Sequence, residues 1–175
     1  RVEPGDAEAQ RLAVEGAAAE ARRRGFEVEV LDQPVSGEAR EAGERFARRA
    51  LERWSRADAA RPRCVVGGGE TTVTVSGSGI GGRNLEFAAA AALTIDGASG
   101  IAVGSIGTDG RDGPTDAAGA VVDGETAVRA RAARLELTDH LRNNDTLRPL
   151  DAAGAVVRTG PTGTNVMDVC VATVV

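Results

Sequence analysis

Stripes of small residues at helical spacing alternate along the chain with short apolar runs, and this pattern restricts the fold more than any other feature. From Asp6 to Arg24, alanines and other small or apolar residues recur every three or four positions, which predicts an amphipathic helix. The following run, Phe26 to Leu31, alternates apolar and acidic residues as a half-buried strand does. A helix whose inner face is small packs closely on a sheet, so the pattern indicates an α/β fold.

The rest of the chain continues this alternation. A turn is expected at residues 32–37, and the three glycines at 67–69 are expected to break the strands on either side of them. The predicted helices cover residues 38–56, 83–94, 125–135 and 139–144. The predicted strands cover residues 63–66, 71–75, 101–107 and 120–123, with two more within 154–175 that a loop rich in threonine and glycine joins.

Aromatic side chains are too few to build the core. The chain has three Phe, one Trp and no Tyr, so Ala, Val, Leu and Ile must fill most of it. A length of 175 residues suits one compact domain better than two. We therefore expect one α/β domain over residues 1–175, three-layered, with a mixed β-sheet flanked by helices. Cys64 and Cys170 lie far apart in strand-like runs and are expected to be small buried residues of a reducing compartment.

The charged residues exclude several functions. All 21 basic residues are arginines, so chemistry that needs a lysine cannot be completed within this chain. A net charge of -5 and the scarcity of aromatic residues argue against nucleic-acid binding. No apolar run approaches the roughly 18 residues of a membrane helix, and no signal-peptide pattern opens the chain. We expect a cytoplasmic protein without membrane or nucleic-acid partners.

The loop GSGIGGRNLEF matches the dinucleotide pattern G-x-G-x-x-G at Gly77, Gly79 and Gly82. That fingerprint needs an acidic residue about 20 positions further on, at the end of the next strand. Asp96 falls at the end of a helix instead, and Asp109 comes 32 positions after Gly77. The pattern therefore does not predict dinucleotide binding.

An anion site at this loop remains a separate hypothesis. A helix N-terminus offers unpaired N–H groups to an anion, and the guanidinium of Arg83 matches a carboxylate or a phosphate. The alternative is a tight turn in which Arg83 pairs with Glu86. Both interpretations stay open at the level of the residues.

Two further loops are rich in polar groups. Asp109, Asp112 and Asp116 follow a predicted strand, where α/β folds place ligand sites, and clustered carboxylates can hold Mg²⁺. The segment from Thr159 to Asn165 combines hydroxyls, an amide and glycines of the kind that cradle phosphate. Aspartate, glycine and proline are also ordinary turn formers, so a plain turn is the alternative at both loops.

Three long segments, GGGETTVTVSGSGIGGRNLEFAAAAA, GTDGRDGPTDAAGA and TGPTGTNVMDV, occur in the order found in one family. Together they resemble the C-terminal domain of the class II glycerate 2-kinases, the MOFRL family, some of which are named hydroxypyruvate reductases. The resemblance is strongest over residues 63–175. It implies that an N-terminal Rossmann-like domain, absent from this chain, forms the other half of an active-site cleft.

The resemblance also implies a reaction and a set of site residues. The family transfers the γ-phosphoryl group of ATP to D-glycerate, usually at the 2-hydroxyl, with Mg²⁺. Arg83 and Asp109 are the expected catalytic residues, and Asp112 and Asp116 the expected metal ligands. The expected substrate and phosphate contacts are Glu70, Thr71, Gly79, Gly81, Gly82, Asn84, Thr162, Thr164 and Asn165. Leu85 stands where relatives usually have Gln.

Three functions therefore compete. The first is the C-terminal part of an ATP-dependent glycerate kinase, whose partners are its own N-terminal domain and glycerate. The second is an NAD(P)H-dependent hydroxypyruvate reductase, for which the acidic partner of the fingerprint is missing. The third is a non-catalytic ligand-binding or oligomerisation module, and a homodimer stays open in each case.

Overall fold

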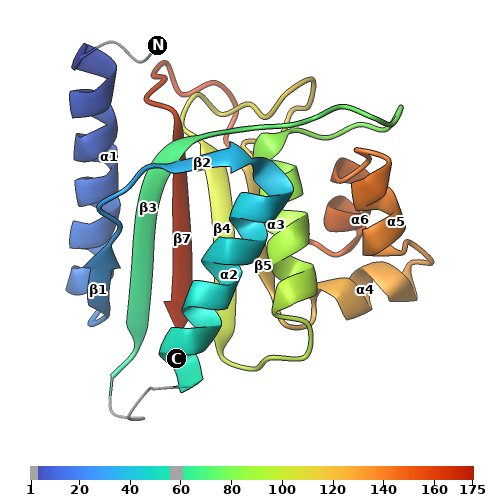
Figure 1. Ribbon diagram of the computed structural model, residues 1–175, viewed down its shortest axis with the longest axis horizontal. Coiled ribbons are helices and arrows are strands. Elements are labelled where there is room, and N and C mark those ends of the chain that lie inside the picture. The colour runs from blue at the N-terminus through green and yellow to red at the C-terminus, as the bar shows by residue number, and fades with distance from the viewer. Residues whose placement is uncertain (1–3, 56–60) are drawn as a thin grey trace.

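The computed structural model describes residues 4–55 and 61–175, which form a mixed β-sheet with helices on both faces (Figure 1). The predicted α/β class with a mixed sheet flanked by helices is confirmed. In chain order the elements are α1 (Pro4–Arg23), β1 (Glu27–Val30), β2 (Val35–Glu38), α2 (Ala39–Ser55), β3 (Arg63–Thr72), α3 (Arg83–Thr94), β4 (Ile101–Gly107), β5 (Gly119–Asp123), α4 (Thr126–Ala132), α5 (Leu137–Arg142), α6 (Leu147–Ala152), β6 (Val156–Val157) and β7 (Asp168–Val174).

The sheet has the order β1-β3-β7-β4-β5-β6, and β2 pairs with the second half of β3. Strands β1 and β2 run parallel to β3, whereas β7 lies antiparallel between β3 and β4. β3 and β4 therefore point the same way, and their carboxyl ends meet the start of β7. This topology brings loops from distant parts of the sequence to one end of the sheet.

Alternation along the strands divides the core between the two faces. Val66 of β3 packs with Val14 and Ala18 of α1, while Val65 faces the larger core that includes residues of α2 and α3. Phe46 and Phe87 meet in that larger core, with ring centroids 5.6 Å apart. Most of the other buried side chains are Ala, Val, Leu and Ile, as the composition predicts. Both cysteines are also buried, as expected.

The strand break predicted at residues 67–69 is wrong. These glycines continue in extended conformation, so β3 is one strand of ten residues rather than two short ones. A Cβ at Gly69 would overlap the backbone of Val35, which pairs with it in β2. Glycine is therefore required here by the close approach of a neighbouring strand, and not by a turn. The segment predicted as a turn at 32–37 contains most of that neighbouring strand.

The remaining differences between the predicted and the observed elements concern the ends of elements and one short helix. The predicted strand 71–75 contributes only Thr71 and Thr72 to β3, and α6 is a short helix that no periodicity predicts. The two C-terminal strands do not pair with each other, because β6 lies beside β5 and β7 lies between β3 and β4. The predicted end of α2 at Arg56 lies outside the described residues. Within residues 4–55 and 61–175, no helix has the length and apolar character needed to cross a membrane.

Candidate active site

Three polar loops meet at the end of the sheet where β3 and β4 terminate (Figure 1). They are the loop after β3, the loop after β4 and the loop that precedes β7. Asp168, the first residue of β7, pairs in register with Gly69 of β3 on one side and with Gly107 of β4 on the other. The three family-like segments of the sequence are therefore neighbours in space.

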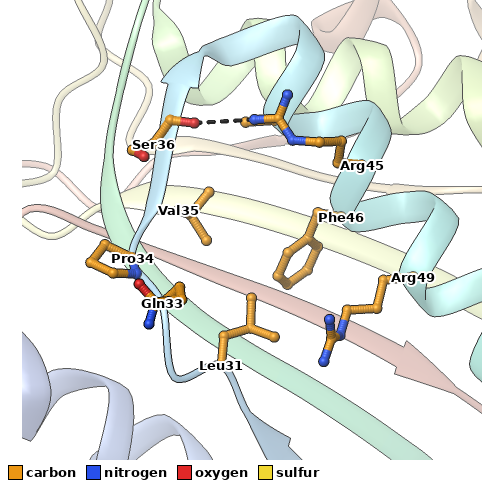
Figure 2. A pocket seen from close by; sticks show the side chains of 9 residues that line it. Leu31, Gln33, Pro34, Val35, Ser36, Arg45, Phe46 and Arg49 are labelled. Atoms are coloured by element: carbon orange, nitrogen blue, oxygen red, sulfur yellow. Dashed lines mark hydrogen bonds between the residues drawn. The ribbon is translucent and has the colours of Figure 1, made fainter.

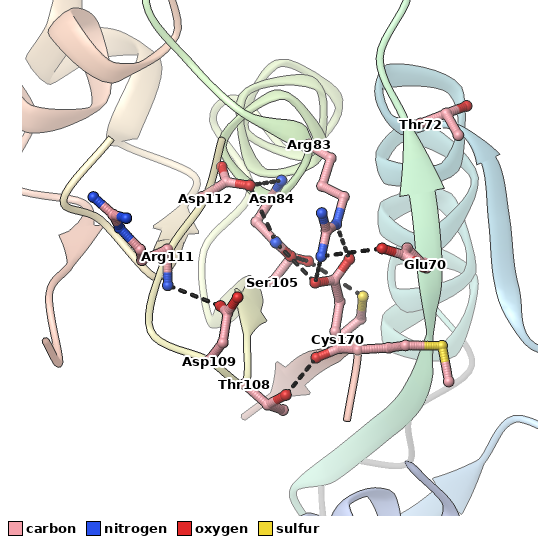
Figure 3. A network of polar contacts seen from close by, with 12 residues as sticks. Glu70, Thr72, Arg83, Asn84, Ser105, Thr108, Asp109, Arg111, Asp112 and Cys170 are labelled. Atoms are coloured by element: carbon pink, nitrogen blue, oxygen red, sulfur yellow. Dashed lines mark hydrogen bonds and ion pairs between the residues drawn. The ribbon is translucent and has the colours of Figure 1, made fainter. Parts of the chain in front are cut away.

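Arg83, the first residue of α3, is held rigidly by Asp168 (Figure 3). Its Nε and Nη2 donate to the two carboxylate oxygens at 2.7 and 2.9 Å, and Asp168 is only 4% exposed. Glu70 lies on the other side, with Oε1 3.5 Å from Nη2. Hydrogen bonding to Asp168 raises the pKa of Arg83, so the guanidinium stays charged in a fixed orientation.

Behind this ion pair, Asn84 joins the two buried carboxylates. Its Nδ2 donates to Asp168 at 3.0 Å and to Asp112 at 3.3 Å, and its Oδ1 accepts from Ser105 Oγ at 2.5 Å. Ser105 also contacts the sulfur of Cys170, and burial raises the pKa of that thiol to about 12. Asn84 is 1% exposed, so its contacts are with the protein interior.

Asp112 caps helix α3. One carboxylate oxygen accepts the backbone N–H of Asn84 at 3.0 Å, and the other accepts that of Leu85 at 2.8 Å. Burial raises the pKa of Asp112, while these two N–H groups oppose that shift. At the helix N-terminus where an anion site was one of two hypotheses, a carboxylate of the chain itself thus accepts two of the N–H groups. Leu85, at a position where the family resemblance led us to expect Gln, is fully buried in the core.

The capping role of Asp112 predicts that two aspartates of the same loop contribute differently to the free energy of unfolding. Replacing Asp112 by Ala should lower the free energy of unfolding by about 2 kcal/mol, because two N–H groups of α3 lose their acceptor. Asp116, which is exposed and pairs with Arg158, is the matched control, and its replacement by Ala should change little. Urea denaturation of both variants measures the difference. Equal effects would contradict the capping role.

The three aspartates of this loop do not share one metal site. Among the described residues, no group of three or more His, Cys, Asp or Glu side chains is placed to hold a metal ion. Asp112 uses both oxygens for the cap and Asp116 pairs with Arg158. Asp109 is half-buried, and its Oδ1 accepts the N–H of Arg111 at 2.9 Å. Of the three, Asp109 fits a single-carboxylate Mg²⁺ ligand best.

The last polar loop is tied to the aspartate loop. Thr162 donates its backbone N–H to the carbonyl oxygen of Asp109 and its hydroxyl to that of Thr108. Thr164 and Asn165 make contacts within their own loop, with Thr162 and Met167. All three predicted residues, Thr162, Thr164 and Asn165, are exposed. They form an open edge beside Asp109.

A cavity of about 500 Å³ opens between the end of β3, the glycine loop and the turn at Gly113 and Pro114. The predicted site residues that line it are Thr71, Gly79, Gly81, Gly82 and Arg83, together with Glu86 and Asn144, which sequence reasoning missed. Val73 and Val75 give it an apolar side. Arg83 lies in the wall of this cavity.

A second cavity, of about 290 Å³, lies between α2 and the segment that connects β1 to β2 (Figure 2). Its arginines are already engaged, since Arg45 donates to the carbonyl oxygen of Ser36 and Arg49 pairs with Glu29. None of the predicted site residues lines it. The cavity that contains Arg83 is therefore the candidate active site.

The most important residue missed from the sequence is Asp168. Its signal was present in the sequence, because Asp168 is the one carboxylate of the segment 168–175, which is otherwise apolar apart from Thr173. Asn144 gave no such signal, since it lies near the predicted end of a helix and far from the glycine loop in sequence.

The fold and the site together define a mixed α/β domain in which polar loops from three segments converge at one sheet end. The MOFRL family model matches residues 63–168, and the chain belongs to this family. It is 44% identical over 156 residues to a D-glycerate 2-kinase of Thermotoga maritima, covering 89% of this chain and 37% of that protein. It is 38% identical over 165 residues to a glycerate 2-kinase of Pyrococcus horikoshii, covering 93% and 37%.

Solved structures agree with the sequence comparisons. The crystal structure of a glycerate kinase from Thermotoga maritima superposes with a TM-score of 0.91 at 41% identity, over 95% of this chain and 40% of that one. The chain therefore spans well under half the length of the relatives it matches.

Proposed function

We propose that this chain forms the C-terminal part of an ATP-dependent glycerate kinase. The reaction transfers the γ-phosphoryl group of ATP to the 2-hydroxyl of D-glycerate. Support comes from the names of the relatives and from their greater length, which leaves room for an N-terminal domain across the cleft. Residues 1–175 then supply one wall of the active site.

The observation that carries this proposal is the position of Arg83. Its guanidinium lines the 500 Å³ cavity and is oriented by the buried carboxylate of Asp168. None of the hydrogen bonds among the described residues uses its Nη1. A rigid guanidinium with a remaining donor can bind the carboxylate of glycerate or stabilise the transferred phosphoryl group at no cost of reorganisation.

The charge around Arg83 indicates what the other half of the site must provide. Three carboxylates, Asp168, Glu70 and Asp112, act on this one arginine, so this end of the sheet is not by itself attractive to ATP. Phosphoryl transfer requires neutralisation of the phosphates. Asp109 is the residue of this chain that would hold Mg²⁺, and the ion would supply part of the positive charge needed. Any lysine that takes part must come from the N-terminal domain, because this chain contains none.

The remaining predicted residues have supporting roles in the proposed enzyme. Thr71 is buried and lines the cavity that contains Arg83, and its hydroxyl is of the kind that can donate to a bound anion. Asn84 and Glu70 hold the arginine and its partner in place. Thr162, Thr164 and Asn165 form the rim next to Asp109.

The function is tested with the full-length protein. It should consume ATP in the presence of D-glycerate and Mg²⁺, with 2-phosphoglycerate as the product by ³¹P NMR. The isolated 175-residue chain should be inactive, because half of the cleft is missing. A protein that is inert with ATP and glycerate but oxidises NAD(P)H with hydroxypyruvate would refute the proposal.

The reductase hypothesis finds no support in the glycine loop. A dinucleotide fingerprint offers its backbone N–H groups to a pyrophosphate. The N–H groups of residues 76–80 are all accepted by other atoms of this chain.

A further inference from the structure

The tripeptide that follows α5, residues 143–145, holds the glycine loop through hydrogen bonds, and we call this set of contacts the clasp. Five consecutive N–H groups, those of residues 76–80, are all accepted by atoms of Asn143, Asn144 and Asp145. Asn144 Oδ1 accepts those of Ser76 and Gly77, Asn143 Oδ1 and its carbonyl oxygen accept those of Ser78 and Gly79, and Asp145 Oδ1 accepts that of Ile80. The distances run from 2.8 to 3.3 Å.

The glycines allow this close contact. A Cβ at Gly77 would lie 2.6 Å from the Cα of Asn143, and one at Gly79 would lie 2.5 Å from the Cα of Asp145. Real Cβ contacts of that kind do not occur, so larger residues would push the loop off the tripeptide. Packing against residues 143–145 thus explains two of the three glycines of the fingerprint-like pattern, Gly77 and Gly79, whereas a Cβ at the third, Gly82, would meet Asp112.

Asn144 makes the most contacts of the three residues, because both the oxygen and the nitrogen of its side-chain amide make two hydrogen bonds. Besides the two N–H groups that it accepts, its Nδ2 donates to Glu86 Oε1 at 2.5 Å and to the carbonyl oxygen of Thr74 at 3.3 Å. Glu86 is 1% exposed and is held from its other side by Arg40 at 2.8 Å. Glu86 lies in the first turn of α3, three residues after Arg83. One amide therefore connects the glycine loop to the helix that presents the arginine.

We infer that Asn144 is a positioning residue for the proposed kinase site, fixing the glycine loop relative to Arg83 across the 500 Å³ cavity. The inference rests on the proposed function. It also means that residues 76–80 present no N–H group to substrate, and Arg83 is the charged donor that lines this cavity. Asp145 is itself held by His140 Nδ1 at 2.8 Å, which steadies the far end of the clasp.

The test uses the variant Asn144→Gly in the full-length protein. Asn144 has a φ of 54°, so glycine removes the side chain without straining the backbone. Arg134→Gly is the matched control: Arg134 has a φ of 64°, is exposed, follows the end of α4 and takes no part in the hydrogen bonds of residues 76–80. We expect amide exchange at Ser76 and Gly77 to accelerate at least about tenfold in Asn144→Gly only. kcat/KM should fall about 10²-fold, and in Arg134→Gly it should stay unchanged.

A reciprocal exchange distinguishes positioning from general destabilisation. Asn144→Asp keeps the acceptor for the two N–H groups but sets a carboxylate against that of Glu86, and we expect kcat/KM to fall about tenfold. Adding Glu86→Gln restores one donor and one acceptor in that contact. The double variant should therefore recover most of the lost activity, whereas additive losses would contradict the inference.

The two proposals fail in different ways. A wild-type protein that consumes no ATP with glycerate refutes the proposed function. An active wild type whose Asn144→Gly variant exchanges Ser76 and Gly77 rapidly, yet retains kcat/KM within about threefold, refutes the positioning role. Unchanged exchange in that variant would refute the clasp itself.

Discussion

Gly43→Ala is expected to lower the free energy of unfolding by about 2–3 kcal/mol, although alanine is the better helix former. Gly43 lies in α2 where that helix crosses α3. A Cβ there would overlap the carbonyl oxygen of Phe87 and lie 2.9 Å from its Cα. Since the obstacle is backbone, the two helices must move apart, and the buried contacts between them weaken.

Gly16→Ala is the matched control for this prediction. Gly16 is also a glycine inside a helix, α1, but an added Cβ meets no atom within 4 Å. The same substitution should therefore raise the free energy of unfolding by about 0.5–1 kcal/mol. Urea denaturation of the two variants measures the expected decrease and the expected increase in the free energy of unfolding. A Gly43→Ala protein as stable as the Gly16→Ala protein would show that α2 and α3 pack less closely than described.

Arg83→Ala in the full-length protein is expected to reduce glycerate-dependent ATP consumption about 10³-fold, the size of effect seen for arginines that stabilise a transferred phosphoryl group. Among the described residues, the same change leaves the buried carboxylate of Asp168 with Asn84 as its one remaining hydrogen-bond donor. We expect it also to cost about 2 kcal/mol of stability. Steady-state kinetics and thermal denaturation measure the two effects separately.

The double variant Arg83→Ala/Asp168→Asn separates chemistry from folding. Replacing the unpaired carboxylate by an amide removes the uncompensated buried charge, so stability should return toward that of the wild type. Activity should not return, because the guanidinium is still missing. Recovery of turnover in the double variant, or unchanged turnover in Arg83→Ala, would show that the arginine is only structural.

The sequence predicted correctly those elements whose signals lie within a few neighbouring residues. Helix α3 was predicted with its observed ends, because a polar first turn and a run of alanines follow a glycine loop directly. The strand β4 and the mixed α/β class follow from apolar runs between helical stripes. Arg83 was singled out from its position at a helix start. Its place in a cavity agrees with that expectation, and its catalytic role stays a prediction.

The errors come from residues whose role depends on a partner distant in sequence. Gly69 was taken as part of a break, but its pairing strand lies more than thirty residues earlier in the chain. Asp112 was expected to bind metal, yet it caps a helix that begins 29 residues before it. Asn144 was placed near a helix end, and the loop that it holds lies 67 residues away. No periodicity or motif reports such contacts.

By itself, the sequence determined the class of fold, the aliphatic core, the absence of lysine chemistry and the three segments that relate this chain to the MOFRL family. These follow from composition and from short-range spacing, which act through helix and strand geometry. Only the tertiary structure decided which carboxylate holds Arg83, which one closes the helix N-terminus and why the loop after β3 needs its glycines. Those answers depend on which distant segments come within hydrogen-bonding distance, and the order of strands in the sheet sets that.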